Sequence, residues 1–333
     1  LLLYTSLMKN FKLILKSLIS NNACVEGGRK KPWYFAAIMF FLAMIFAVLP
    51  LFVQTWNTNG DDVFKTNAYG LDQAAYRFID DKLDKEGLKI YVRANGDKKE
   101  IVCEKADGAQ VRDVDYTHTI PVKASDGTYT EQPDYIFHYR AVYNEGELST
   151  LLGDEKTSMV FIYDTKVLIH VVNFETKATI KNIVCNEAPK YLKEGQSINE
   201  LLSKDSDPTV RMSETFSNWK LFIRDAYNFT RLTQVWQTVA IMGGINAGIT
   251  LFMGLMIWIL TRGKHNPYRL FNLWETQKIA WWAAITPSIL ALAFGFLIQS
   301  FANILFPMVL GVRVMWLSMK SLRPDGSGYA AAD

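Results

Sequence analysis

Apolar residues along this chain are concentrated in one block near residue 40 and in a second region from about residue 235 to residue 319, whereas charged residues fill the interval between them. The first block, Trp33 to Val53, carries no charge. It is long enough, at about 1.5 Å per helical residue, to cross a hydrocarbon core about 30 Å thick. A second uncharged run occupies residues 234–260. This pattern is typical of an integral membrane protein.

Two further apolar runs, Ile279 to Ile298 and Phe301 to Met319, are separated only by Gln299 and Ser300. Because so short a connection makes neighbouring helices antiparallel, we expect residues 279–319 to form a transmembrane helical hairpin. The total is then four transmembrane helices. We expect a proline to interrupt three of these helices: Pro50, Pro287 and Pro307.

Tryptophan residues flank the first two spans: Trp33 and Trp56 bracket one, and Trp236 and Trp258 bracket the other. Such pairs are typical of the aromatic belts at the two membrane–water interfaces, so we interpret all four as interfacial anchors. We expect three more tryptophans to share one interface: Trp281, Trp282 and Trp316.

Basic residues cluster beside the predicted spans. Segments 1–32, 261–278 and 320–333, together with Arg313, hold 13 basic residues against four acidic ones. Segment 54–233 holds 23 basic and 29 acidic residues. Because Lys and Arg are enriched in cytoplasmic flanks, we expect a multi-pass plasma-membrane protein with both termini, the basic loop 261–278 and the tail 320–333 in the cytoplasm, and with 54–233 as an extracytoplasmic domain.

The segment before the first span predicts an amphipathic helix, in which lysines alternate with apolar residues in a way that differs from a secretory signal. The two sides are Leu7, Phe11, Ile14 and Leu18 on one, and Lys9, Lys12 and Lys16 on the other. We interpret it as an interfacial helix on an anionic leaflet. A short helix packed on the protein itself is the alternative. The stretch from Met8 also looks like a more natural start than the residues before it.

The extracytoplasmic domain combines a predicted helix, Asp72 to Glu86 with Gly87 after it, and several strands, so its expected class is α+β. Asn95-Gly96 predicts a hairpin turn between the first two strands. The expected strands are Leu88–Arg93, Glu100–Glu104, Asp134–Tyr143, Ser158–Tyr163 and Val167–Asn173.

Residues from Ser213 onward have helical periodicity, with neither Gly nor Pro between Met212 and Val235. We expect one helix to run from the domain into the second span as far as Leu260. Two helices with a bend near Asn228 are the alternative.

Candidate catalytic groups are few. Asp113, Asp115 and His118 could offer metal ligands, but strand alternation would place the two aspartates on one face and His118 on the other. His138 and His170 lie within apolar strands, where a satisfied histidine is commoner than a ligand. We therefore expect no catalytic residue, metal site or cofactor in this domain.

Two other features carry little chemistry. Residues 59–62, NGDD, resemble a fragment of a calcium loop without its distal Glu, and we interpret them as a solvated turn. Of the three cysteines, Cys24, Cys103 and Cys185, only the last two could pair. We expect both to be simple buried residues, with a disulfide as the alternative.

The spans contain no Asp, Glu, Lys or His in their centres, and Arg313 is close enough to the cytoplasmic end to snorkel. Proton-coupled transport is thus disfavoured. Gly244 and Gly248 form a GxxxG pair with Asn246 between them, which favours close helix packing inside the protein. A face that binds a partner is the alternative.

Several segments together resemble a known family. FKLILKSLISNN before the first span, FHYRAVYNEGELSTLLGDEKTSMVFIYDTKVLIHV in the domain, and NPYRL followed by AAITPSILALAFGF resemble the DUF1189 family of bacterial membrane proteins. The resemblance covers nearly the whole chain. It implies a maltodextrin-utilisation-type membrane protein with an accessory place beside sugar uptake, and it supplies no catalytic residues. The N-terminal extension and NNACVEGGRKK depart from the family.

These patterns favour a non-enzymatic accessory or sensory membrane protein, whose outer domain binds a ligand or partner. A component of an oligomeric transporter is the second hypothesis, and an envelope enzyme is the third. The expected partners are the lipid bilayer and either a membrane protein or further copies of this chain. The formal net charge of +3 gives no reason to expect nucleic acid.

Overall fold

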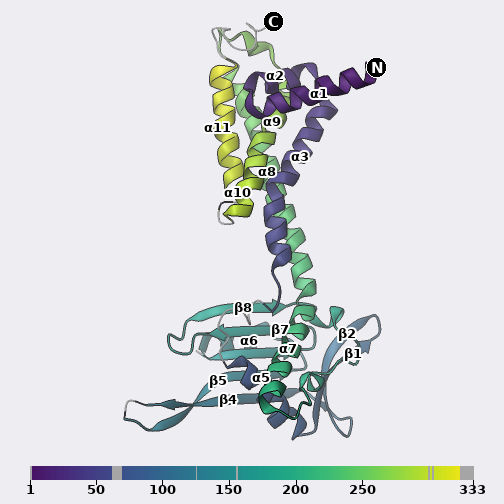
Figure 1. Cartoon of the computed structure of the whole chain (residues 1–333), viewed down its shortest axis with the longest axis vertical. Coiled ribbons are helices and arrows are strands. Elements are labelled where there is room, and N and C mark those ends of the chain that lie inside the picture. Colours follow the sequence, from purple (N-terminus) through teal and green to yellow (C-terminus); the bar gives the residue numbers. More distant parts are fainter. Residues whose placement is uncertain are drawn as a thin grey trace. The chain divides into compact units, whose positions relative to one another are not determined.

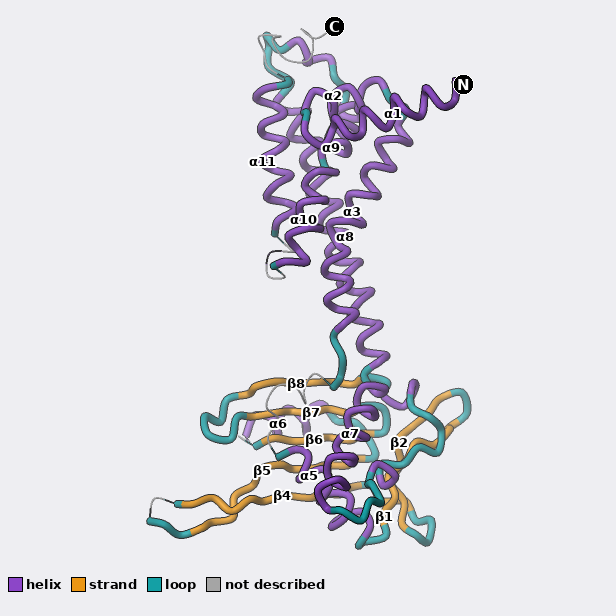
Figure 2. Tube along the Cα trace, viewed as in Figure 1, coloured by secondary structure: helices purple, strands orange, loops and turns teal. Residues whose placement is uncertain are grey.

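The computed structural model describes residues 2–61, 70–124, 126–154, 157–298, 301 and 304–322. Two compact units divide the chain. The helical unit consists of Leu1–Asn57 and Gln234–Asp333, and the α+β unit is Thr58–Thr233. Figure 1 labels the elements of both units, and in Figure 2 all the strands belong to the second. The α+β class expected for residues 54–233 is confirmed.

The described helices of the helical unit include three stretches long and apolar enough to cross a membrane: α3, α8, and α9 with α10 taken together. The expected fourth span corresponds to α11, whose 16 residues extend about 24 Å, less than a hydrocarbon core. The expected turn at Gln299 and Ser300 and the tail from 323 lie outside the described residues. The helices are α1 Leu2–Ile19, α2 Asn21–Lys30, α3 Trp33–Asn57, α8 Asn228–Leu260, α9 Leu273–Ala283, α10 Ile285–Leu297 and α11 Leu305–Lys320.

The three prolines differ in their effect. Pro50 lies inside α3, which continues for seven more residues to Asn57, so it does not end that helix. Pro287 does interrupt the expected span 279–298: α9 ends at Ala283, α10 begins at Ile285, and Pro287 has no N–H to donate to Ala283 O. Pro307 stands third in α11, where the first-turn N–H groups have no intrahelical acceptor, so it removes no helical hydrogen bond.

The core of the helical unit contains residues of α2, α3, α9, α10 and α11, and one of its close approaches lies where α2 packs on α9. A Cβ added to Gly27 would lie 2.6 Å from Cδ2 of Trp282, and one added to Gly28 would lie 2.5 Å from Cγ1 of Ile279. Only glycine allows this approach. Trp282 is 1% exposed, so it packs inside the helical unit, and its expected place at a common membrane interface stays a prediction. Its indole fills the space beside Gly27, and Ile279 fills the space beside Gly28.

Helix α1 packs on this core through one side. Leu13 is buried, and Ile14 and Leu18 contact the same apolar cluster. Phe11 is 59% exposed and Ile19 is 93% exposed, although the pattern had placed Phe11 beside Ile14 and Leu18. The alternative of packing on the protein thus applies to the side of α1 that carries Leu13, Ile14 and Leu18, whereas Phe11 and Ile19 are exposed.

The α+β unit contains two sheets. One has the order β1-β2-β3, and the other has the order β4-β5-β6-β7-β8, in which only β5 and β6 are parallel. The connection between these two parallel strands passes through α6, Glu145–Asp154. The strands are β1 Leu88–Asn95, β2 Lys98–Lys105, β3 Gln110–Val111, β4 Asp113–Lys123, β5 Tyr129–Arg140, β6 Ser158–Tyr163, β7 Val167–Val172 and β8 Thr179–Cys185.

The predicted strands and the first hairpin are confirmed, with ends that differ by a few residues. In the β1–β2 hairpin Asn95 pairs with Lys98, and Gly96 adopts a positive φ of 61°, which glycine tolerates. The expected helix 72–86 is also present, but in two parts. These are α5, Leu71–Arg77, and a π-helical continuation, η1, Phe78–Asp84.

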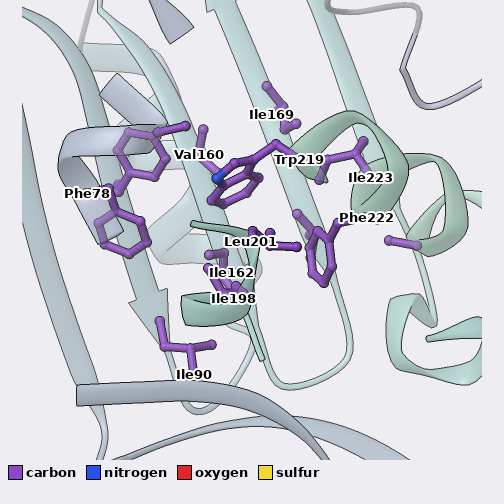
Figure 3. Packing of buried hydrophobic residues seen from close by; sticks show 14 of the residues in the cluster. Phe78, Ile90, Val160, Ile162, Ile169, Ile198, Leu201, Trp219, Phe222 and Ile223 are labelled. Carbon is purple, nitrogen blue, oxygen red and sulfur yellow. The ribbon is translucent and has the colours of Figure 1, made fainter. Parts of the chain in front are cut away.

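The main core of the α+β unit lies between the five-stranded sheet and two helical segments, α5 with η1 and α7, Pro208–Ala226. Figure 3 shows Trp219 of α7 among Phe78, Leu201 and Phe222. An indole buries about 200 Å², which at about 25 cal/mol per Å² contributes about 5 kcal/mol. Trp219 is buried and packs edge-on against Phe137 of β5, with ring centroids 6.2 Å apart, so it holds α7 on the sheet.

The expected single helix from Ser213 to Leu260 is divided. Helix α7 ends at Ala226, α8 begins at Asn228, and Tyr227 stands between them. The alternative of two helices is thus what the structure has. Hydrogen bonds still cross the division, because the Tyr227 N–H donates to Ile223 O and the Arg231 N–H donates to Tyr227 O, both at 2.9 Å.

Candidate functional site

The carboxylates and histidines singled out by the sequence lie on β4 and β5. Asp113 and Asp115 lie on one exposed face of β4, while His118 is 6% exposed on the other. The predicted separation of His118 from the two aspartates is confirmed. The strand register places Asp115 directly opposite His138. No pattern in the sequence had joined these two residues.

Asp115 accepts two hydrogen bonds across the strands, from His138 Nδ1 at 2.5 Å and from Arg140 Nη1 at 2.8 Å. Burial opposes ionisation of Asp115, but the bonds and charges of Arg140 and His138 outweigh it, so the pKa of this carboxyl lies below its usual value. The His138 ring also stacks on Phe161, with centroids 4.8 Å apart. This set is a charge-paired strand contact without a nucleophile.

A second carboxyl pairs with the buried histidine. Asp134 Oδ2 lies 3.8 Å from His118 Nδ1. Burial raises the pKa of Asp134 to about 6, an effect that the charge of Lys177 opposes and that of Asp72 reinforces. Burial also lowers the pKa of His118. Ionisation is thus disfavoured at both groups.

The other candidates sit in structural contacts. His170 Nδ1 lies 2.5 Å from Asn182 Oδ1 on the neighbouring strand. Cys103 and Cys185 are free, buried thiols, and burial raises the pKa of both. Across the described residues, no group of three His, Cys, Asp or Glu side chains could hold a metal ion.

The turn at residues 59–62 packs more closely than the solvated turn that was expected, with Asp62 outside the described residues. A Cβ on Gly60 would lie 2.6 Å from both Ile223 O and Tyr227 Cβ. Arg231 Nη1 donates to Asn59 Oδ1 at 3.2 Å. Inside the α+β unit, the two segments that lead to the helical unit are therefore fastened to each other.

A cleft of about 510 Å³ between η1, the β1–β2 hairpin and Asn199 was missed by the sequence analysis. The Tyr91 hydroxyl donates to Glu104 Oε2 at 2.7 Å, and Arg93 Nη1 holds the other oxygen of Glu104 at 3.1 Å. The bond to Glu104 raises the pKa of Tyr91. Tyr91 and Asn199 are 108 positions apart in the sequence, so no local motif could have joined them.

The cleft is electrically balanced. Lys89 and Lys105 offset Asp84 and Glu104 among its lining residues. Asn199 is held in place, because its Nδ2 donates to Asp84 Oδ1 and to Leu88 O, both at 2.8 Å. The arrangement offers fixed hydrogen-bond donors and acceptors around a tyrosine ring, and it favours neither an anion nor a cation.

In the helical unit, the predicted packing residues divide between two sides of α8. Asn246 is buried, whereas Gly244 and Gly248 are exposed, and a Cβ at either glycine would meet no described atom within 4 Å. The close packing of α8 is instead at Gly254, where a Cβ would lie 2.2 Å from Gln277 Oε1. Packing inside the protein thus does not explain the GxxxG pair.

The predicted anchors are largely on the surface of the unit. Trp33, Trp56 and Trp236 are 59%, 41% and 65% exposed. Trp258 is half-buried, and the guanidinium of Arg262 lies 4.4 Å from its ring centroid. These positions are compatible with interfacial anchors, and that role stays a prediction.

No family model, curated protein or solved structure matches this chain. The resemblance to the DUF1189 family therefore stays a prediction.

Proposed function

We propose that this chain is a multi-pass plasma-membrane protein with four spans, both termini in the cytoplasm and the α+β unit outside. Its role is that of a non-enzymatic accessory or sensory protein. The three apolar helices support this proposal, as does the exposure of large apolar residues such as Phe41, Phe252 and Phe296 on them. Residues of this kind lie in lipid when a helix spans a membrane.

The observation that carries a sensory role is that α8 belongs to both units. Its first turn is held by the α+β unit, because Thr230 Oγ1 accepts from the Asn186 N–H at 2.7 Å and Lys190 Nζ lies 4.6 Å from the Phe229 ring centroid. The same helix then continues to Leu260 as a candidate span. An unbroken helix transmits a displacement that a flexible linker would dissipate.

The ligand of the proposed outer domain is a neutral polyhydroxylated molecule, and maltodextrin is the one that the family resemblance implies. Sugar hydroxyls both donate and accept hydrogen bonds, which suits a cleft where the carboxylates of Asp84 and Glu104 stand beside Lys89 and Lys105. The Tyr91 ring, with Lys89 Nζ 5.5 Å from its centroid, lines the cleft and is the aromatic surface against which a sugar ring would pack. The charges that line the cleft balance, so the cleft does not attract an ion.

Titration of the purified full chain with maltodextrin tests this assignment by calorimetry. Tyr91→Ala should weaken binding about three- to tenfold, because an aromatic contact contributes about 0.5–1.5 kcal/mol. The matched control is Tyr129→Ala, since Tyr129 is 68% exposed on the same unit and does not line the cleft. An equal loss in both variants, or no binding by the unaltered chain, would remove maltodextrin as the ligand.

A component of an oligomeric transporter is the second candidate. The open Gly244 and Gly248 face of α8 favours it, because GxxxG surfaces let two helices approach closely. The partner would be a further copy of this chain or another membrane protein.

A further inference from the structure

The helical unit contains a second pocket of about 510 Å³. It lies where the end of α1, the start of α2 and one side of α11 meet, and Ser20, Asn21, Arg313 and Lys320 are among its lining residues. Nothing in the proposed function uses it.

Arg313 is fixed at this pocket by main-chain acceptors. Its Nη1 donates to Ala283 O at 3.0 Å, and its Nη2 donates to Ser17 O. The Ala283 carbonyl needs such a donor, because Pro287, four residues on, has no N–H to offer it. Nη2 also contacts Cys24 Sγ at 3.3 Å, and Nε lies 3.5 Å from Asn21 Oδ1. These contacts therefore hold the guanidinium in one position.

The pocket is positively charged. Arg313 and Lys320 line it, and no Asp or Glu occurs among the described residues that surround it. Arg313 forms no ion pair with any carboxylate in the described part of the chain. The carbonyl ends of α1 and α9 offset part of its charge through their dipoles. Lys320 lies at the carbonyl end of α11, and its Nζ lies 5.8 Å from the ring centroid of Trp316.

The start of α2 adds further donors. Ser20 is its N-cap and makes no side-chain capping bond, so the first N–H groups of this ten-residue helix lack a capping acceptor from it. Asn21 and Asn22 of that first turn line the pocket. N–H groups at a helix start and two cationic side chains are the groups that bind phosphate.

The apolar part of the lining opens toward the surface. Val312 and Trp316 of α11 are each 57% exposed, and Ile19 at the end of α1 is 93% exposed. A free phosphate would leave this surface in water. A molecule with a phosphate and an acyl chain would cover both parts.

We propose that this pocket binds the phosphate headgroup of an anionic phospholipid, with an acyl chain along Val312 and Trp316. The inference rests on the proposed membrane location. Arg313 and Lys320 attract the headgroup. The exposed apolar residues of α1, Phe11 and Ile19, lie beside it in the same leaflet. The site thus joins the N-terminal helix to α11 through a lipid.

Native mass spectrometry of the detergent-purified full chain tests this. With equal amounts of phosphatidylglycerol and phosphatidylcholine, the unaltered chain should retain the anionic lipid preferentially. Lys320→Gln should lower that retention about fivefold, because one basic residue near an anionic headgroup contributes about 1 kcal/mol. Lys320 is exposed and lies at the last turn of α11, so the fold does not depend on it. Lys264→Gln, in an exposed turn outside the pocket, should change nothing.

Equal retention of the two lipids, or equal losses in the two variants, would overturn the site. Displacement of phosphatidylglycerol by millimolar inorganic phosphate would assign the pocket to a free anion and overturn the lipid assignment. Failure of the membrane proposal is a separate result, because the chain would then appear in the soluble fraction of cells before any detergent is added.

Discussion

Asp134 and Asp115 lie on neighbouring strands, yet their surroundings shift their carboxyl pKa values in opposite directions. Burial raises the pKa of Asp134 from 3.8 to about 6, so the folded chain holds this proton more tightly than the unfolded chain does. The contribution of Asp134 to the free energy of unfolding is therefore fully present below pH 3.8 and is lost as the pH rises to about 6.

Replacing Asp134 with Asn should remove this loss. At pH 7.5 the free energy of unfolding should rise by about 1–3 kcal/mol, since a shift of one pKa unit corresponds to about 1.4 kcal/mol. Its decline between about pH 4 and pH 6 should flatten. Thermal unfolding of the full chain across that range measures both effects.

Asp115→Asn serves as the control, because its effect on stability should have the opposite sign. The pKa of Asp115 is lowered, so its ionised form stabilises the fold above its unfolded pKa and that contribution is lost as the pH falls. The variant should therefore melt at a lower temperature than the unaltered chain at pH 7.5. An Asp134→Asn variant that also melted lower would show that the ionised carboxylate is needed.

Local patterns predicted the faces of these residues but not their partners. Alternation along β4 is enough to separate Asp115 from His118. The contact of Asp115 with His138 depends on the register of β4 with β5, which shifts between His118 and Thr119. That register is set by packing of the whole sheet, and no short window of sequence contains it.

At the scale of elements, the periodicity of the sequence predicted whether a segment is a helix or a strand better than it predicted where that element begins and ends. Ser158–Tyr163 is a strand over the residues expected, because a short β-branched and aromatic run has few alternatives. The division at Tyr227 could not be found in the same way, since a single residue between two helices leaves the 3.6-residue period almost intact. The cleft beside Tyr91 was missed because its walls come from elements far apart in the chain.

The open glycine face of α8 gives a prediction at this scale. Gly244→Leu should leave the fold of one chain unchanged, because the added side chain meets no described atom within 4 Å of its Cβ and leucine favours helix more than glycine does. It should reduce self-association if two copies pack through this face. Cross-linking in membranes and the mass of the purified particle measure this.

Gly254→Leu is the contrasting variant. A Cβ there would lie 2.2 Å from Gln277 Oε1, so this change should disturb the packing of α8 on α9 and lower the stability of the single chain. An unchanged oligomeric state in Gly244→Leu would remove the face as a site of self-association. The transporter hypothesis would then lose the observation that favours it.

At the scale of the whole molecule, the topology can be tested with single cysteines. Segments 1–32, 261–278 and 320–333, together with Arg313, hold 13 basic residues against four acidic ones, and this excess predicts that these segments are cytoplasmic. In intact cells a membrane-impermeant thiol reagent should label Tyr129→Cys but not Lys264→Cys, and both side chains are exposed in the fold. The three native cysteines are buried and give little background. Labelling of Lys264→Cys alone would reverse the orientation.

The last prediction concerns coupling between the two units through α8. The junction at Thr233 and Gln234 is exposed and lies within the helix, five residues after it begins. Inserting Gly-Gly-Ser-Gly there should break the helix, because glycine loses more backbone entropy on folding than any other residue. Each unit keeps its own core.

Binding of maltodextrin by the α+β unit should therefore survive the insertion, whereas its effect on the membrane part should not. In the unaltered chain, the ligand should slow hydrogen exchange of the backbone amides in residues 240–260, because it stabilises the unit that holds the start of α8. The insertion should abolish that slowing. The same four residues placed after Gly127, in the exposed β4–β5 turn, should leave it intact. If the junction variant kept the ligand-dependent protection, α8 would not couple the units, and the α+β unit would be a tethered binding module.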